Sequence, residues 1–83
     1  MRKEDIINWL INWFGENSMM EKEEIRLFTS ESYFEKGLID SFVFIQLIED
    51  IEEEYQIEFG NEQFEDRSFA TIEGLAEIIE RSL

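Results

Sequence analysis

The chain of 83 residues contains no cysteine and no histidine. Without cysteine it forms no disulfide and offers no thiolate as ligand or nucleophile. Without either residue it has no Ser-His-Asp or Cys-His arrangement and no histidine base near neutral pH. Catalysis would depend on carboxylates as the only acid-base groups, and the sequence places none in an evident apolar pair. We therefore expect a protein that is not an enzyme.

Basic residues are also scarce, with seven Lys and Arg against 21 Asp and Glu and a formal net charge of -14. This balance argues against binding to nucleic acid or to an anionic membrane surface, and it favours a monomer with basic-surfaced protein partners. No apolar run approaches the roughly 20 residues of a membrane span. Arg2 and Lys3 are not followed by the continuous apolar run of a signal peptide, so a cytoplasmic location is expected.

The negative charge is concentrated in residues 37–66, which hold ten acidic side chains and no Lys or Arg. Their mutual repulsion opposes the compact state most strongly at low ionic strength. We predict that added salt or divalent cations raise the melting temperature of the protein. Thermal unfolding followed at increasing salt concentration tests this, and an unchanged melting temperature would count against it.

The composition predicts one small folded domain over residues 1–83, because 43% of the residues are hydrophobic and 34% are charged. Apolar residues recur at helical spacing, which predicts an all-α fold. A first helix is expected from about Lys3 to Phe14, ended by Gly15. Leu83 is expected on the inner side of the last helix. The other predicted elements are a helical turn around Glu21–Phe28, a second helix from Phe42 to Phe59 broken by Gly60 and Asn61, a short helix inside Glu62–Ser68, and a last helix capped by Thr71 and mildly weakened by Gly74.

Several apolar side chains are expected to hold the long connection of residues 15–40 against the core. They are Ile25, Leu27, Phe28, Tyr33, Phe34 and Leu38.

The second helix is predicted to have two different faces. Its inner stripe repeats at steps of three and four and consists of Phe44, Leu47, Ile48, Ile51 and Tyr55. At about 100° per residue, Phe42 and Ile45 fall on the outer face, which Glu49 and Glu53 continue. Such a face suits docking onto a partner surface that has a hydrophobic notch ringed by Lys and Arg, although a plain solvated helix side is an alternative for each glutamate.

The segment Gly37-Leu38-Ile39-Asp40-Ser41-Phe42 places a serine where a polar loop enters this helix. Asp40 and Ser41 are both good capping residues. Ser41 would lie at the positive end of the helix dipole beside free backbone N–H groups, where a phosphate ester on its oxygen is favoured. The pattern therefore suggests a modification site, with a plain N-cap as the alternative.

These residues, followed by the apolar and acidic run from Phe42 to Tyr55, resemble the phosphopantetheine attachment region of acyl carrier proteins. The resemblance covers nearly the whole chain. Downstream, Ile57-Glu58-Phe59, Phe64 and Phe69-Ala70-Thr71-Ile72 with Leu75, Ile78 and Ile79 are similar to the family's short third helix and amphipathic fourth, and upstream Ile6, Ile7, Leu10 and Phe14 fit its first. The resemblance implies a small acyl-carrier-like bundle of three main helices plus one short helix.

By this resemblance, Ser41 carries a 4'-phosphopantetheine arm taken from coenzyme A, whose thiol holds an acyl group as a thioester. The implied partners are a phosphopantetheinyl transferase, a loading ligase and downstream synthases or transferases with basic docking surfaces. Asp40 is read as a second capping acid or as a contact to the transferase or its Mg²⁺, and these roles are compatible. The chain itself shows no metal loop, because the Asp-x-Asp-x-Asp-Gly spacing of an EF-hand is missing.

Gly37 lies four residues before Ser41, whereas the fatty-acid carriers usually have this glycine three residues before the serine. The spacing is more similar to stand-alone carriers of specialised pathways, which load amino acids or unusual acyl groups. An aminoacyl carrier of the D-alanyl type is therefore an alternative, as is a non-modified acidic adaptor in which Ser41 is only a cap. Similar carriers often have a smaller residue than Phe44, so its ring suggests a small or polar cargo, or one held outside the bundle; an ordinary core aromatic is the alternative.

Overall fold

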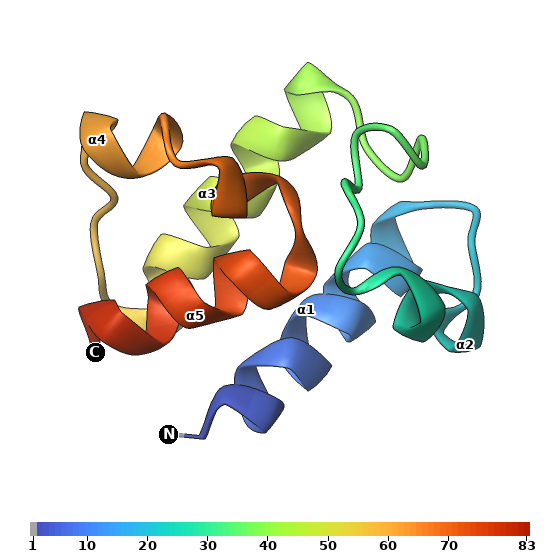
Figure 1. The fold of residues 1–83 in the computed structure, drawn as a ribbon, viewed down its shortest axis with the longest axis horizontal. Helices are drawn as coiled ribbons and strands as arrows, with labels where there is room; N and C mark the ends of the chain where they lie inside the picture. The colour runs from blue at the N-terminus through green and yellow to red at the C-terminus, as the bar shows by residue number, and fades with distance from the viewer. Residues whose placement is uncertain (1) are drawn as a thin grey trace.

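The structure is a computed structural model that describes residues 2–83, and over this range it is all-α, as the sequence predicts. Figure 1 shows α5 in front of the lower part of α3 and α1 beside α5, with α4 and the loop before α3 on opposite sides of the view. The elements in chain order are α1 (Lys3–Asn17), α2 (Lys22–Ile25), the 3-10 turn η1 (Arg26–Phe28), α3 (Ser41–Tyr55), α4 (Asn61–Phe64), the 3-10 turn η2 (Arg67–Ala70) and α5 (Ile72–Ser82).

Helix α1 buries a broad apolar face made of Ile6, Leu10, Ile11, Trp13 and Phe14. The prediction that Gly15 ends this helix is wrong, because α1 continues to Asn17. Gly15 instead allows the close approach of α2: a Cβ at this position would lie 2.6 Å from Cγ of Lys22. The glycine therefore serves packing between two helices.

Helix α3 ends at Tyr55, so the predicted continuation to Phe59 and the predicted break at Gly60 and Asn61 are wrong. Gln56 adopts the left-handed region with φ +55°, and its N–H donates to the carbonyl of Glu52. The Glu52 carboxylate then accepts the N–H of Phe59 at 3.0 Å, which turns the chain back toward the helix. A left-handed residue ends an α-helix whether or not it is glycine.

The remaining elements agree more closely with expectation. The turn at Glu21–Phe28 is confirmed by α2 and η1, and the short helix appears as α4 followed by η2. Thr71 caps α5 as predicted, since its Oγ1 accepts the N–H of Gly74 at 2.9 Å. Leu83, expected on the inner side, is instead exposed because α5 ends at Ser82.

Hydrogen bonds and aromatic contacts connect the helices at several points. Nε1 of the buried Trp13 donates to the Asp50 carboxylate at 2.7 Å, which joins α1 to α3. The rings of Trp9 and Tyr55 meet edge to face with centroids 5.6 Å apart. Both tryptophans are thus packing residues. No helix in residues 2–83 is both long enough and apolar enough to cross a membrane.

The loop before α3 is fastened to the opposite end of the chain. Tyr33 is buried, its hydroxyl donates to the carbonyl of Phe69, and its N–H donates to that of Ala70 at 3.0 Å. The carbonyl of Thr29 accepts the N–H of Glu73 at 2.9 Å. Of the residues expected to pin this connection, Ile25, Tyr33 and Leu38 are buried and Phe28 is half-buried, whereas Leu27 and Phe34 are exposed, contrary to expectation.

The buried side chains of Tyr33 and Tyr55 predict a loss of stability at alkaline pH. Burial, with smaller contributions from Glu54 and Asp5, raises the pKa of Tyr55 to about 12, and burial raises the pKa of Tyr33 above its ordinary value. In the unfolded chain both ionise near pH 10, so the unfolded state loses its protons first. The contribution of the two tyrosines to the free energy of unfolding is fully present below about pH 10, and it is lost as the pH rises toward their pKa in the folded state.

Urea unfolding at a series of pH values, with tyrosinate absorbance as a second signal, measures this loss. Tyr55→Phe should reduce the drop above about pH 10, since phenylalanine does not titrate. A free energy of unfolding that stays constant through this range would contradict the prediction.

Candidate functional site

The serine singled out by the sequence lies at the first residue of α3, and it is exposed. Its hydroxyl makes no hydrogen bond to any group in residues 2–83. The N–H groups of Ser41 and Phe42 precede the first intrahelical bond, in which the N–H of Phe44 donates to the carbonyl of Asp40 at 2.9 Å. A hydroxyl and two free N–H groups therefore meet at the positive end of a fifteen-residue helix.

Asp40 is the N-cap of α3, which confirms one of the two roles expected for it. Its Oδ1 accepts the N–H of Val43 at 2.9 Å, and its backbone is extended. The other carboxylate oxygen makes no bond within the described chain, and the residue is exposed. The cap leaves one carboxylate oxygen beside Ser41 that is free to contact a cation or a partner.

The turn before the site requires a glycine at position 37. Gly37 has φ +72°, a conformation that other L-residues rarely adopt, and a Cβ there would meet no atom within 4 Å. The N–H of Leu38 closes the turn by donating to the carbonyl of Tyr33 at 3.0 Å. Leu38 and Ile39 then insert into the core, which fixes the direction in which Asp40 and Ser41 leave it.

Aromatic rings cluster around Phe44, close to the start of α3. Phe44 is half-buried, and its ring contacts those of Phe34, Phe69 and Phe64 at centroid separations of 5.1, 5.9 and 6.5 Å. The Tyr33 and Phe34 rings lie beside them with centroids 4.9 Å apart. The predicted inner position of Phe44 is confirmed, and the openings that remain around it are surface grooves.

The outer face of α3 has the composition that helical phase predicts. Phe42 is 85% exposed and Ile45 is 58% exposed, so two large apolar side chains face solvent within one turn of Ser41. Glu49 and Glu53 are exposed further along the same helix. An apolar groove of about 200 Å³ runs beside Ile45 and Glu49.

The electrostatics of the site are strongly negative. Two ion pairs, Lys3 with Glu77 and Lys36 with Glu31, occur in the described residues, and neither involves a carboxylate of residues 37–66. No group of three potential metal ligands lies close enough to hold an ion anywhere in residues 2–83. The site offers an accessible hydroxyl, and the neighbouring Asp40 uses one of its two carboxylate oxygens to cap the helix.

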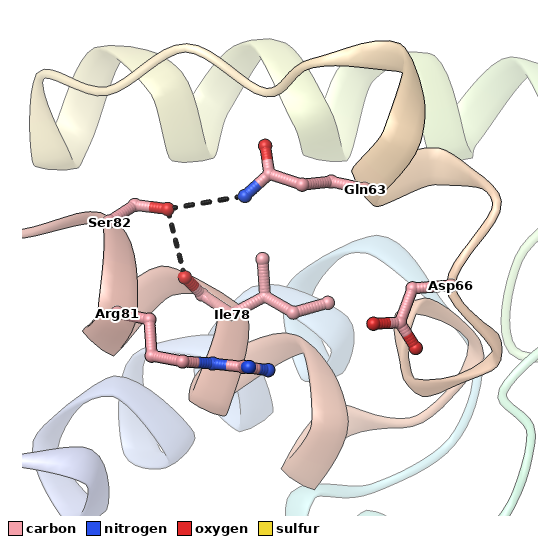
Figure 2. Close-up of a pocket in the computed structure, with 5 residues that line it drawn as sticks. All are labelled: Gln63, Asp66, Ile78, Arg81 and Ser82. Carbon is pink, nitrogen blue, oxygen red and sulfur yellow. Dashed lines mark hydrogen bonds between the residues drawn. The ribbon is translucent and has the colours of Figure 1, made fainter.

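A second pocket, of about 180 Å³, lies between α4 and the end of α5 (Figure 2). Gln63 donates to Oγ of Ser82 at 3.4 Å, and Ser82 donates to the carbonyl of Ile78 at 2.9 Å. Arg81 and Asp66 complete the lining without pairing. The first bond joins α4 to α5 and the second lies within α5, so the Ser82 hydroxyl, unlike that of Ser41, is part-buried and bonded.

The comparisons with known proteins identify the family of the chain. The family model described as the phosphopantetheine attachment site matches residues 8–79, which is most of the chain and includes Ser41. No curated protein and no solved structure gives a significant match.

Proposed function

Because the chain belongs to the phosphopantetheine attachment-site family, we propose that residues 1–83 form one carrier domain modified at Ser41. Proteins of this family carry a covalently bound 4'-phosphopantetheine group. The observation that carries the assignment is the exposed, unbonded hydroxyl at the start of a long helix. Among the serines of residues 2–83, Ser41 alone begins a helix.

The surroundings of Ser41 fit a phosphate ester. The free N–H groups of Ser41 and Phe42 can donate to phosphate oxygens, and the helix dipole favours negative charge at this end. The Asp40 carboxylate opposes that charge, so a cation such as Mg²⁺ beside its free oxygen would assist the transfer. This supports both proposed roles of Asp40, as cap and as contact to the transferase or its metal.

In the attachment step, the Ser41 oxygen attacks the phosphorus that bears the pantetheine part of coenzyme A. A new P–O bond to Ser41 forms, the pyrophosphate P–O bond breaks, and adenosine 3',5'-bisphosphate leaves. The hydroxyl proton passes to a base of the transferase, since the chain contains no histidine or cysteine and the free Asp40 oxygen is proposed to face the cation. The attached group supplies a thiol that holds cargo as a thioester.

Delivery to other enzymes is the proposed activity, and the chain itself is proposed to be non-catalytic. Family members interact with phosphopantetheinyl transferases and biosynthetic enzymes. Phe42 and Ile45 supply apolar contact, and Glu49 and Glu53 supply charge for enzymes with basic docking surfaces. The high net charge of -14 supports a monomer, because two such chains repel each other.

The cargo is proposed to be an acyl or aminoacyl group, with a small or polar one favoured. The rings of Phe34 and Phe69 pack against Phe44, and a long alkyl chain would have to displace them or remain in water at about 0.8 kcal/mol per exposed methylene. An aminoacyl cargo of the D-alanyl type is compatible with this packing. The position of Gly37, four residues before Ser41, supports the same class.

Intact-mass measurement tests the proposal directly. The protein is incubated with a broad-specificity phosphopantetheinyl transferase, Mg²⁺ and coenzyme A, and a sample without coenzyme A serves as control. We expect a gain of one 4'-phosphopantetheine, located by tandem mass spectrometry on the peptide that contains Ser41. If the folded protein gains no mass, the acidic adaptor becomes the better description of the chain.

A further inference from the structure

Another groove includes residues of the turn that leads to the attachment site. It has a volume of about 240 Å³ and is lined by Ser18, Met19, Met20, Glu24, Gly37 and Leu38. We refer to these six residues as the methionine groove. Because Gly37 and Leu38 form the turn that leads to Ser41, the groove adjoins the proposed site through the chain itself.

The methionine groove exposes an apolar side chain with no intramolecular contact to explain it. Met19 is fully exposed, whereas Met20 packs against the core. Oγ of Ser18 accepts the N–H of Met20 at 3.3 Å, and this tight turn leaves Met19 directed outward. Methionine adapts its shape to different surfaces and is common where proteins bind partners.

The rim of the groove is acidic. Glu24 lines the groove, and the exposed Glu16, Glu21 and Glu23 lie close to its methionines in the sequence. Of the cations in this part of the chain, Lys36 pairs with Glu31 at 3.2 Å and lies over the Phe28 ring, Arg26 donates to Asn8 at 3.1 Å, and the aliphatic part of Lys22 lies over Gly15. They are outnumbered by the acidic residues. The groove therefore complements an apolar side chain that projects from a lysine- or arginine-rich surface.

The chemistry of the site indicates which partner presents that surface. An enzyme that acts on the end of the arm can remain an arm's length away from Ser41. The transferase must instead bring its active site into bonding distance of the Ser41 oxygen, so its surface covers the residues on both sides of that oxygen. In chain order, Phe42 and Ile45 follow Ser41, and Gly37 and Leu38 of the methionine groove precede it.

We propose that the methionine groove is a docking site for the phosphopantetheinyl transferase, with Met19 in contact with an apolar side chain of the enzyme and Glu24 facing its basic residues. This inference rests on the proposed function. It adds to the proposed interface a second apolar contact, near the turn that precedes Ser41, beside the contact that Phe42 and Ile45 supply after it.

Steady-state kinetics of phosphopantetheine transfer to the full chain, with the same transferase, test the inference. The Met19→Gln variant is compared with Leu27→Gln. Leu27 is also an exposed apolar residue, but it lies on η1 outside the groove. We expect Met19→Gln to raise the KM for the protein about fivefold with kcat within about twofold, because a binding contact is lost while the reacting atoms are unchanged. Leu27→Gln should leave KM within about twofold of the parent.

Two variants that each remove one negative charge distinguish a specific contact at Glu24 from an effect of the net charge of the protein. Glu24→Gln should raise KM and weaken its dependence on salt, whereas Glu80→Gln, which removes the same charge from α5, should not. If the parent is modified and Met19→Gln has an unchanged KM, the docking inference is overturned and the proposed function stands. If the parent itself gains no arm, the proposed function fails and the inference falls with it.

Discussion

A Ser41→Ala chain is expected to gain no mass under conditions in which the parent is fully converted to the phosphopantetheine form. Alanine has no oxygen to attack the phosphorus, so the loss should be complete rather than partial. Intact-mass spectrometry at several times of incubation measures this directly. It is the largest functional effect that we predict for any single substitution in the chain.

The variant should remain folded, which makes a negative result informative. The Ser41 hydroxyl makes no hydrogen bond within residues 2–83, and Asp40 continues to cap α3 through Val43. Alanine also has the higher helix propensity. We expect the free energy of unfolding to change by less than about 0.5 kcal/mol, as for other exposed substitutions.

Ser30→Ala is the matched control, because Ser30 is also exposed and precedes the same helix, in the loop fastened by Tyr33. It should be modified at the parental rate. If the Ser41→Ala protein gained the mass of one phosphopantetheine, the attachment site would be a hydroxyl other than that of Ser41. Failure of both variants and of the parent would instead argue against the carrier role altogether.

The helices are predictable because their apolar residues repeat at helical spacing, but their ends are not. A glycine at position 15 predicts the end of α1, and only the approach of Lys22 in three dimensions shows why a glycine is needed inside the helix. Helix α3 ends at Tyr55, and the residue after it, Gln56, is neither glycine nor proline, so no local sequence signal predicts this end. Both errors arise from contacts between elements or from a left-handed residue of unexpected type, which a local pattern does not contain.

The attachment region is predictable to a greater degree. The order Asp40-Ser41 before an apolar helix indicates the cap, and helical phase alone places Phe42 and Ile45 outside. Three long-range features have no sequence signal: the bonds of Tyr33 to Phe69 and Ala70, the insertion of Ile39 into the core, and the groove beside Met19. A tyrosine in a polar loop does indicate burial, but not which carbonyl it meets.

Gly74→Ala is expected to lower the free energy of unfolding by about 3 kcal/mol, although alanine is the better helix former by about 1 kcal/mol. Sequence alone marks this glycine as a mild weakness of α5. In the structure it is buried, and a Cβ there would overlap the carbonyl oxygen of Ser68 and lie 2.7 Å from its carbonyl carbon. Since these are backbone atoms, no side-chain rotation relieves the overlap.

Relief would require η2 to move away from α5, and the bonds between them oppose that movement. Thr71 caps α5 through Gly74, and its own N–H donates to the Ser68 carbonyl at 3.3 Å. Displacing η2 would also disturb Phe69, whose carbonyl holds the hydroxyl of Tyr33. The steric cost should therefore exceed the gain in helix propensity, and it is large against a total stability of about 5–15 kcal/mol.

Urea unfolding followed by tryptophan fluorescence measures the effect, with Gly60→Ala as the control. Gly60 has φ −90°, and a Cβ at this position would meet no atom within 4 Å, so alanine there should cost less than about 1 kcal/mol, mainly through the weaker cap of α4. A Gly74→Ala protein as stable as the parent would show that η2 shifts freely. In that case the contact between η2 and α5 would not determine where the loop leading to Ser41 is held.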